Sequence, residues 1–171
     1  GQDAGFLGRA TDPWLLACEP ESDAFQIPGL GLPAEVPGMR FQERNALLQQ
    51  MNARIDSMQR QGVLGLHDSR TQKAIDLIGS PRARAAFNLN QETVPMRDRY
   101  GRTRFGQSML LARRLVEAGV PFVRVNWTRV KNAHNNGHWD THSKNTAGLQ
   151  QLMPIAAAAY SALLEDLSER G

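Results

Sequence analysis

The sequence contains a single cysteine, Cys18, among its 171 residues, which excludes an internal disulfide. No partner motif surrounds this residue, so we interpret it as a small hydrophobic side chain rather than a nucleophile. No apolar run approaches the roughly 20 residues that a membrane-spanning helix needs, and the first residues lack the pattern of a signal peptide. We therefore expect no membrane partner.

Lysine and aromatic residues are also scarce. The 20 basic residues comprise 17 arginines and three lysines, aromatic residues make up 6% of the chain, and the net charge is +3. Arginine suits carboxylate, sulfate and phosphate groups. One group of arginines leaves open a non-enzymatic alternative, a basic helical interaction module for an acidic partner or nucleic acid: Arg97, Arg99, Arg102, Arg104, Arg113 and Arg114. Because stacking aromatics do not alternate with them, nucleic acid is the disfavoured partner.

The remaining composition is that of a globular domain, with 41% hydrophobic and 22% charged residues. The chain does not begin with methionine, and a helical pattern still continues through 163–170 when it stops. We therefore expect a single partial domain, an interior piece of a larger protein, whose first partner is the remainder of that parent chain.

Four regions are predicted along the chain. Residues 1–38 are rich in glycine and proline and predict an extended arm that packs against a body through residues such as Phe6, Trp14 and Leu15. Residues 40–118 predict a helical region, and 145–170 a long helix that Pro154 kinks or splits. The helices expected in 40–118 run from about 40 to 59, from Asp68 or Ser69 to Ile78, and over 81–87, 94–99 and 105–118, the last closed by Gly119.

Between the last two helices, residues 121–127 are nearly continuous in β-forming residues and predict one core strand. The step from helix to strand is typical of an α/β layered fold, here a predominantly helical piece of one. One strand cannot satisfy its own edges, so we expect its neighbours outside this chain. The region 120–142 then consists of this strand and a polar loop that ends in a metal motif.

Asp140 and His142 form that motif, because an oxygen and an imidazole nitrogen two residues apart on an extended segment can face one ion. Zinc accepts both ligand types, although a catalytic zinc takes three protein ligands. The competing interpretation is that Asp140 or Thr141 merely forms a turn or caps the following helix and leaves His142 in solvent. His134 and His138 are further candidates to complete a local site.

Three stretches carry a resemblance to a known family: Arg99 to Gly101, Phe105 to Val123, and Val125 to Trp127 together with Trp139 to His142. They resemble the bacterial family called domain of unknown function 1501, which is related to sulfatases within the alkaline phosphatase superfamily. Further matches to the middle of that family spread the resemblance over essentially the whole chain: Gly1 to Gly8, Asp12-Pro13 and Leu163 to Leu167.

The resemblance implies an alkaline-phosphatase-like α/β sandwich and a metallohydrolase that acts on sulfate or phosphate esters. It implies that Asp140 and His142 bind a divalent metal, zinc or alternatively calcium or another divalent ion, with Thr141 behind them and Trp139 as a pocket wall. The nucleophile is expected upstream and further ligands downstream, so this piece alone is expected to be inactive. Relatives tend to be exported, which implies a periplasmic or extracellular protein.

One departure from the family lies between strand and motif. Most relatives pass through a short Gly-Gly step, whereas here residues 128–138 intervene. This insertion is expected either to line the pocket, with His138 near it and Arg129 or Lys131 reaching an anionic ester, or to play no part in the site.

Overall fold

The computed structural model describes residues 5–7, 12–23, 25, 43, 46, 47, 50 and 81–171. The chain divides into two units, one of residues 1–17 with 27–81 and the other of residues 18–26 with 82–171. We describe each unit by itself. The helix predicted from Asp68 or Ser69 to Ile78 lies outside the described residues, as does most of the helix predicted at 40–59.

The described part of the first unit is small. It contains the 3-10 helix η1 (Gly5–Leu7), a segment without regular secondary structure at 12–17, and helical residues within the range predicted for a helix: Glu43, Ala46, Leu47 and Gln50. Phe6, Trp14 and Leu15 are exposed by more than half, and the packing of the arm against a body stays a prediction.

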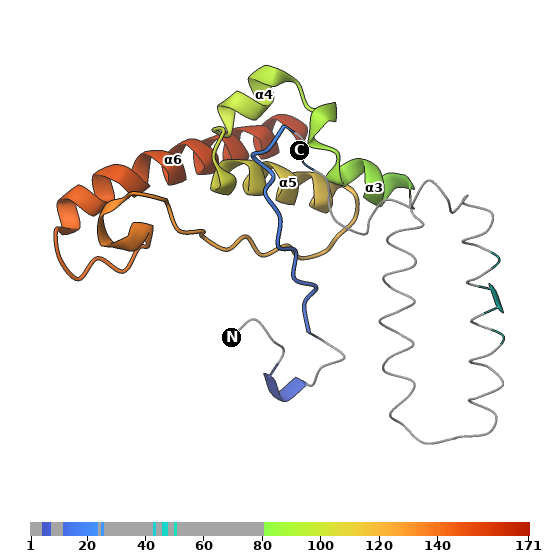
Figure 1. Ribbon diagram of the computed structural model, residues 1–171. Helices are drawn as coiled ribbons and strands as arrows, with labels where there is room; N and C mark the ends of the chain where they lie inside the picture. Colours follow the sequence, from blue (N-terminus) through green and yellow to red (C-terminus); the bar gives the residue numbers. More distant parts are fainter. Residues whose placement is uncertain are drawn as a thin grey trace. The chain divides into compact units, whose positions relative to one another are not determined.

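The second unit is mainly helical (Figure 1). Its elements are α3 (Pro81–Phe87), η3 (Leu89–Gln91), α4 (Val94–Arg99), α5 (Arg104–Glu117), η4 (His134–Gly137) and α6 (Asn145–Arg170). The four α-helices occupy the predicted places, and α5 differs by one residue at each end. The Thr93 hydroxyl accepts a hydrogen bond from the Met96 amide, and the Thr103 hydroxyl accepts one from Gly106 at 3.1 Å, so threonine caps begin α4 and α5.

Helix α6 is continuous over 26 residues and includes Pro154. Proline cannot donate the backbone hydrogen bond to the carbonyl four residues before it. The helix nevertheless continues on both sides, so of the two predicted alternatives the split does not occur, and the kink stays a prediction.

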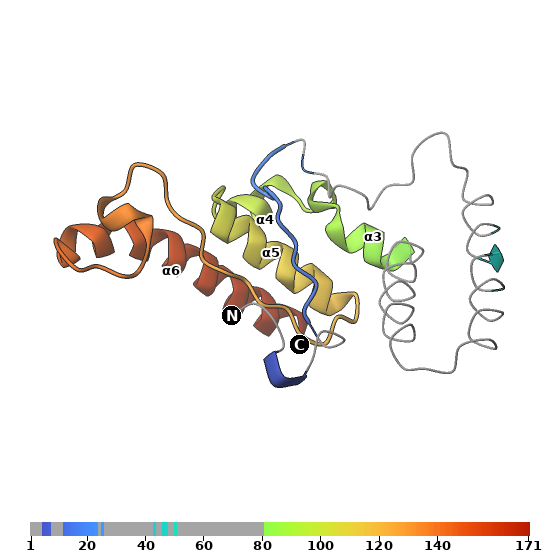
Figure 2. The same ribbon diagram turned by 60° about the horizontal axis from the view of Figure 1, so that its bottom comes forward.

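Helices α5 and α6 lie side by side and run in the same direction (Figures 1 and 2). Ion pairs one turn apart fix this direction, because Arg113 pairs with Asp166 and Glu117 pairs with Arg170. Both helices carry buried apolar side chains: Leu110, Leu111 and Leu115 on α5, and Leu152, Ala159 and Ala162 on α6. Since the helices are parallel, the connection between them must return along their length.

That connection is the segment predicted to be a strand. Residues 122–130 have no regular secondary structure and run as an extended chain back toward the start of α6 (Figures 1 and 2). Burial alternates along it, with Val123, Val125 and Trp127 partly buried and the residues between them exposed. An extended return between parallel helices is typical of α/β layers. No β-strand occurs among the described residues, so the strand at 121–127 and the α/β sandwich stay predictions.

A buried ionic cluster joins α5 and α6. The side chains of Arg113 and Asp166 are each only 1% exposed, and Arg113 Nε lies 3.0 Å from Asp166 Oδ2. The Tyr100 hydroxyl donates to Asp166 at 2.9 Å, and Arg170 Nε donates to the other carboxylate oxygen at 2.5 Å. Burial by itself would raise the pKa of the Asp166 carboxyl. The hydrogen bonds from Arg170 and Tyr100 and the charge of Arg113 outweigh it, so the pKa is lowered.

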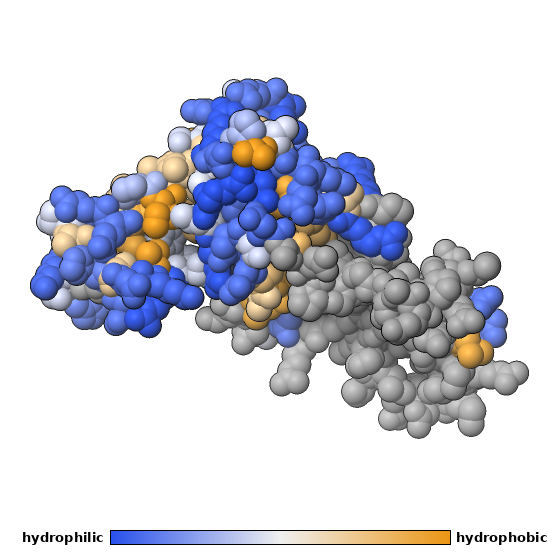
Figure 3. Space-filling view, turned by 45° about the horizontal axis from the view of Figure 1, so that its top comes forward, coloured by the Kyte–Doolittle hydropathy of each residue, from blue (hydrophilic) through white to orange (hydrophobic). Residues whose placement is uncertain are grey.

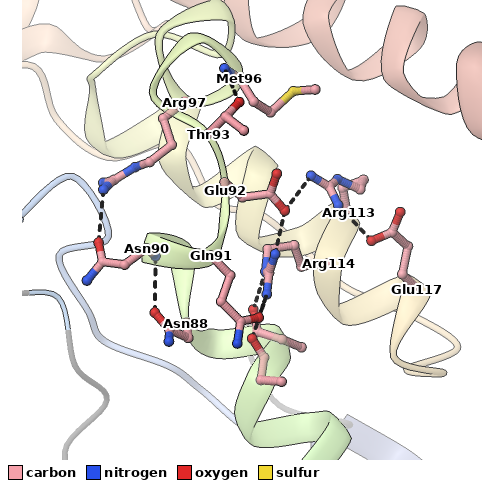
Figure 4. Close-up of polar contacts among 12 residues, drawn as sticks. Asn88, Asn90, Gln91, Glu92, Thr93, Met96, Arg97, Arg113, Arg114 and Glu117 are labelled. Atoms are coloured by element: carbon pink, nitrogen blue, oxygen red, sulfur yellow. Dashed lines mark hydrogen bonds and ion pairs between the residues drawn. The ribbon is translucent and has the colours of Figure 1, made fainter.

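The cluster extends through Glu92 to the segment before α4 (Figure 4). Arg113 also forms ion pairs with Glu92 at 2.9 Å and with Glu117 at 2.6 Å. Arg114 pairs with Glu92 and donates to the Ala85 carbonyl at 2.6 Å. These bonds hold α3 and the turn before α4 against α5.

Gly106 lies where the first turn of α5 touches the end of α4. A Cβ at this position would lie 2.1 Å from the Tyr100 carbonyl oxygen and 2.6 Å from the Gly101 carbonyl oxygen. The buried Gln107 amide donates to the Arg97 and Gly101 carbonyls at 2.8 and 2.9 Å, which fixes the same close approach. The glycine is therefore required by packing.

Gly106→Ala is expected to destabilise the protein, although this exchange in an ordinary helix stabilises by about 1 kcal/mol. The added methyl group meets backbone oxygens that hydrogen bonds hold in place, so overpacking should cost about 1–3 kcal/mol. Chemical denaturation measures the free energy of unfolding, and Ser108→Ala in the same turn is the control. Equal or higher stability of Gly106→Ala would contradict the packing described.

Arg113→Met is expected to lower the free energy of unfolding by about 3–5 kcal/mol, because it removes the buried counter-charge shared by Asp166 and Glu92 and leaves each with one arginine. Arg102→Met is the matched control, since Arg102 pairs with Asp98 at the surface and its loss should cost less than about 1 kcal/mol. Urea denaturation compares the two variants. Similar losses of unfolding free energy in both variants would show that the buried cluster stabilises the protein no more than a surface ion pair does.

Candidate functional site

The side chains of Asp140 and His142 meet just before α6. His142 Nδ1 lies 2.7 Å from Asp140 Oδ1, the distance of a hydrogen bond donated by the imidazole to the carboxylate. Both side chains project into solvent, with exposed fractions of 82% for His142 and 77% for Asp140. The structure thus brings together the two residues predicted as metal ligands.

Neither Asp140 nor Thr141 caps α6. The residue before the helix is Lys144, which has a left-handed backbone (φ 51°) and forms no side-chain capping bond. The Thr141 hydroxyl instead donates to the Asn145 side-chain oxygen at 2.6 Å. A helix cap at Asp140 or Thr141 is therefore wrong, whereas the turn and the solvent exposure of His142 in the competing interpretation are not contradicted.

The insertion before the motif forms a closed loop. The Val130 amide donates to the Gly137 carbonyl at 3.2 Å, and a Cβ on Gly137 (φ +69°) would lie 2.2 Å from the Val130 carbonyl oxygen. Inside the loop, the His134 amide donates to the Gln151 side chain at 2.7 Å and so attaches η4 to α6. Because its two ends touch, the loop returns the chain to nearly the place that it left.

Three aromatic rings connect this loop to the helical body. Trp127 lies between Phe105, at 4.7 Å between ring centroids, and Trp139, at 4.8 Å. The Trp127 indole N–H donates to the Gly137 carbonyl at 3.0 Å, so this carbonyl accepts a second hydrogen bond. We call Phe105, Trp127 and Trp139 the aromatic clamp. It links the first turn of α5 to the residue directly before Asp140.

The other predicted site residues are more dispersed. Arg129 donates to the Asn136 side chain at 3.4 Å within the loop, and His138 is exposed. Trp139 belongs to the aromatic clamp, and no described contact joins it to His142 directly. Among the described residues, no third histidine, cysteine, aspartate or glutamate joins Asp140 and His142 in a metal-binding group.

The sequence interpretation gave no site role to three residues that contact one another beside the pair: Trp127, Gly137 and Phe105. Two signals for them were present, because tryptophan ends the predicted strand and glycine ends the Asn-Asn-Gly turn. Their partners lie 10 to 22 residues away, so only the fold shows that these residues act together.

Charge is unevenly distributed over the second unit. Residues 18–26, 82–119 and 145–171 contain nine arginines and nine acidic residues, whereas 120–144 contains four basic residues and only Asp140 as an acid. The four basic side chains are all exposed: Arg124, Arg129, Lys131 and Lys144. The excess positive charge of this unit therefore lies in the segment that carries the candidate site.

The arginines of the non-enzymatic alternative are engaged within the chain. Arg97 donates to Gln107 at 2.8 Å, Arg99 pairs with Glu165 and Glu169, and Arg104 pairs with Glu19 and Glu21. Arg102, Arg113 and Arg114 form the ion pairs described above. Acidic partners neutralise five of the six arginines, and Arg97 is buried, which weighs against a basic binding surface on the helical body. The alternative stays a prediction.

Hydrophilic residues predominate on the described part of the face in Figure 3, and apolar residues gather there in smaller patches. Within the described ranges, no helix has the length and apolar character needed to cross a membrane.

One family model, described as protein of unknown function (DUF1501), matches residues 1–171. No curated protein and no solved structure matches the chain.

Proposed function

We propose that this chain, which belongs to the DUF1501 family, is part of a metal-dependent hydrolase of sulfate or phosphate esters. The observation that carries the proposal is the contact of Asp140 with His142 at 2.7 Å on an exposed segment. At this distance an oxygen and a nitrogen donor can both reach one ion, and the exposure of the two side chains leaves them accessible to it.

Asp140 and His142 would hold the metal, and their chemistry fits zinc because zinc accepts both oxygen and nitrogen ligands. When bound, the metal would neutralise ester oxygens and lower the pKa of a water molecule or nucleophile.

The pair accounts for only part of a site. A catalytic zinc takes three protein ligands, and the described residues offer two in one place. The proposal therefore requires at least one more ligand, and a nucleophile, from residues beyond those described. Thr141 would support the pair through its bond to Asn145.

An anionic substrate is supported by the distribution of charge. The helical body contains equal numbers of arginines and acidic residues, whereas segment 120–144, which carries the pair, has four exposed basic residues and one acid. A local positive potential raises the concentration of an anionic substrate and its association rate. Arg129 and Lys131 lie in the loop before the pair, and Lys144 follows it.

Asp140→Ala and His142→Ala are each expected to lower the metal content of the complete protein and to abolish ester hydrolysis. Metal analysis of the purified variants and assays with an aryl sulfate and an aryl phosphate measure the two effects. Asp98→Ala removes a surface carboxylate elsewhere and is the control. Full metal content and activity in both site variants would eliminate the proposed function.

Lys131→Gln combined with Lys144→Gln is expected to lower kcat/KM for the anionic ester several-fold at low ionic strength. The difference should shrink as salt rises, because the Debye length falls to about 10 Å at 0.1 M. Arg82→Gln with Arg84→Gln makes the same change of charge on α3 and serves as the matched control. A similar loss in the control pair, or a loss independent of salt, would count against substrate attraction by this segment.

A further inference from the structure

We infer that Trp127 is a positioning residue for the Asp140–His142 pair, and that the aromatic clamp transmits the rigidity of α5 to this pair. The inference rests on the proposed function, because it assigns to Trp127 the task of holding two metal ligands. Trp127 itself would not touch the metal or the substrate.

The need for such a residue follows from the exposure of the pair. Side chains that are 82% and 77% exposed have little packing of their own to hold them in one conformation. Fixing mobile side chains on metal binding lowers their conformational entropy, so a loosely held pair would bind the metal more weakly. The order of the pair must therefore come from the backbone that carries it.

Trp127 is the residue that fixes this backbone. Its ring packs on Trp139, the direct neighbour of Asp140, and its indole N–H binds the carbonyl of Gly137, three residues before Asp140. The short run from Gly137 to Asp140 is thus held at two points by one side chain. The Val130 amide binds the same carbonyl and closes the loop behind it.

The other side of Trp127 rests on a rigid base. Its ring contacts Phe105 in the first turn of α5. The next residue, Gly106, lies so close to the Tyr100 and Gly101 carbonyls that the first turn of α5 cannot shift toward them. Gln107 is hydrogen bonded to the Arg97 and Gly101 carbonyls. The clamp therefore starts from a well-packed part of the unit and ends at the ligand pair.

The two kinds of contact can be separated by substitution. Trp127→Phe keeps an aromatic ring between Phe105 and Trp139 but loses the N–H donor, and Trp127→Leu loses both. Phe87→Leu is the matched control, because Phe87 is buried in the same unit and outside the clamp, so its loss affects stability alone.

The experiment measures zinc affinity and the pH profile of hydrolysis in the complete protein. Outer residues that orient metal ligands typically change metal affinity by about 10- to 100-fold. Trp127→Leu should weaken zinc binding within this range, and Trp127→Phe should weaken it less. Phe87→Leu should bind zinc as tightly as the wild-type protein even if its stability falls.

Two readouts without metal distinguish failure of this inference from failure of the proposed function. Circular dichroism detects the exciton coupling between Trp127 and Trp139, which Trp127→Phe and Trp139→Phe should each remove. Hydrogen exchange of the amides of residues 138–142 should become faster in Trp127→Leu and not in Phe87→Leu.

Unchanged zinc affinity and unchanged exchange in Trp127→Leu would overturn the positioning role. If Asp140→Ala and His142→Ala leave zinc bound, the proposed function fails and the metal-positioning role fails with it. Faster exchange in Trp127→Leu would then still show that Trp127 orders the segment. If Asp140→Ala and His142→Ala lose zinc but Trp127→Leu binds it as tightly as the wild-type protein, this inference fails and the proposed function stands.

Discussion

The burial of Arg113 against Asp166 is the interaction on which the second unit depends. Both charges lose their hydration, so the pair depends on the charged and polar groups that surround it. Glu92 and Glu117 form ion pairs with Arg113, and Tyr100 and Arg170 donate hydrogen bonds to Asp166. Only a parallel arrangement of α5 and α6 completes this set, and the parallel arrangement in turn makes residues 118–144 return along the helices.

The stretch from Tyr100 to Arg113 is therefore largely structural. Tyr100, Gly106, Gln107 and Arg113 lie in the interior, where they join helices and exclude water. The Trp139 to His142 string is different, because its polar side chains are exposed and no requirement of helix packing places them there. Interior residues of the chain therefore hold the helices together, whereas the exposed Asp140 and His142 side chains carry the candidate chemistry.

The sequence predicted the local features well, because their causes are local. Spacing of apolar residues located α5, Ser80-Pro81 placed the start of α3, and Gly119 has the left-handed conformation expected of it (φ +100°). The roles of Arg97 and Arg113 were not predictable, since their partners lie up to 77 residues away. At the site, the meeting of Asp140 with His142 followed from their spacing, whereas the clamp around Trp127 depends on tertiary contacts.

The closure of the insertion at Val130 and Gly137 determines how the loop tolerates change. Because the two ends of the loop are hydrogen bonded to each other, residues at its tip can be added, removed or exchanged without shifting the chain on either side. Loop-closure entropy changes only slowly with length, so such variation costs little stability. Residues 131–136 can therefore be exchanged without moving Trp127 or the segment that carries Asp140 and His142.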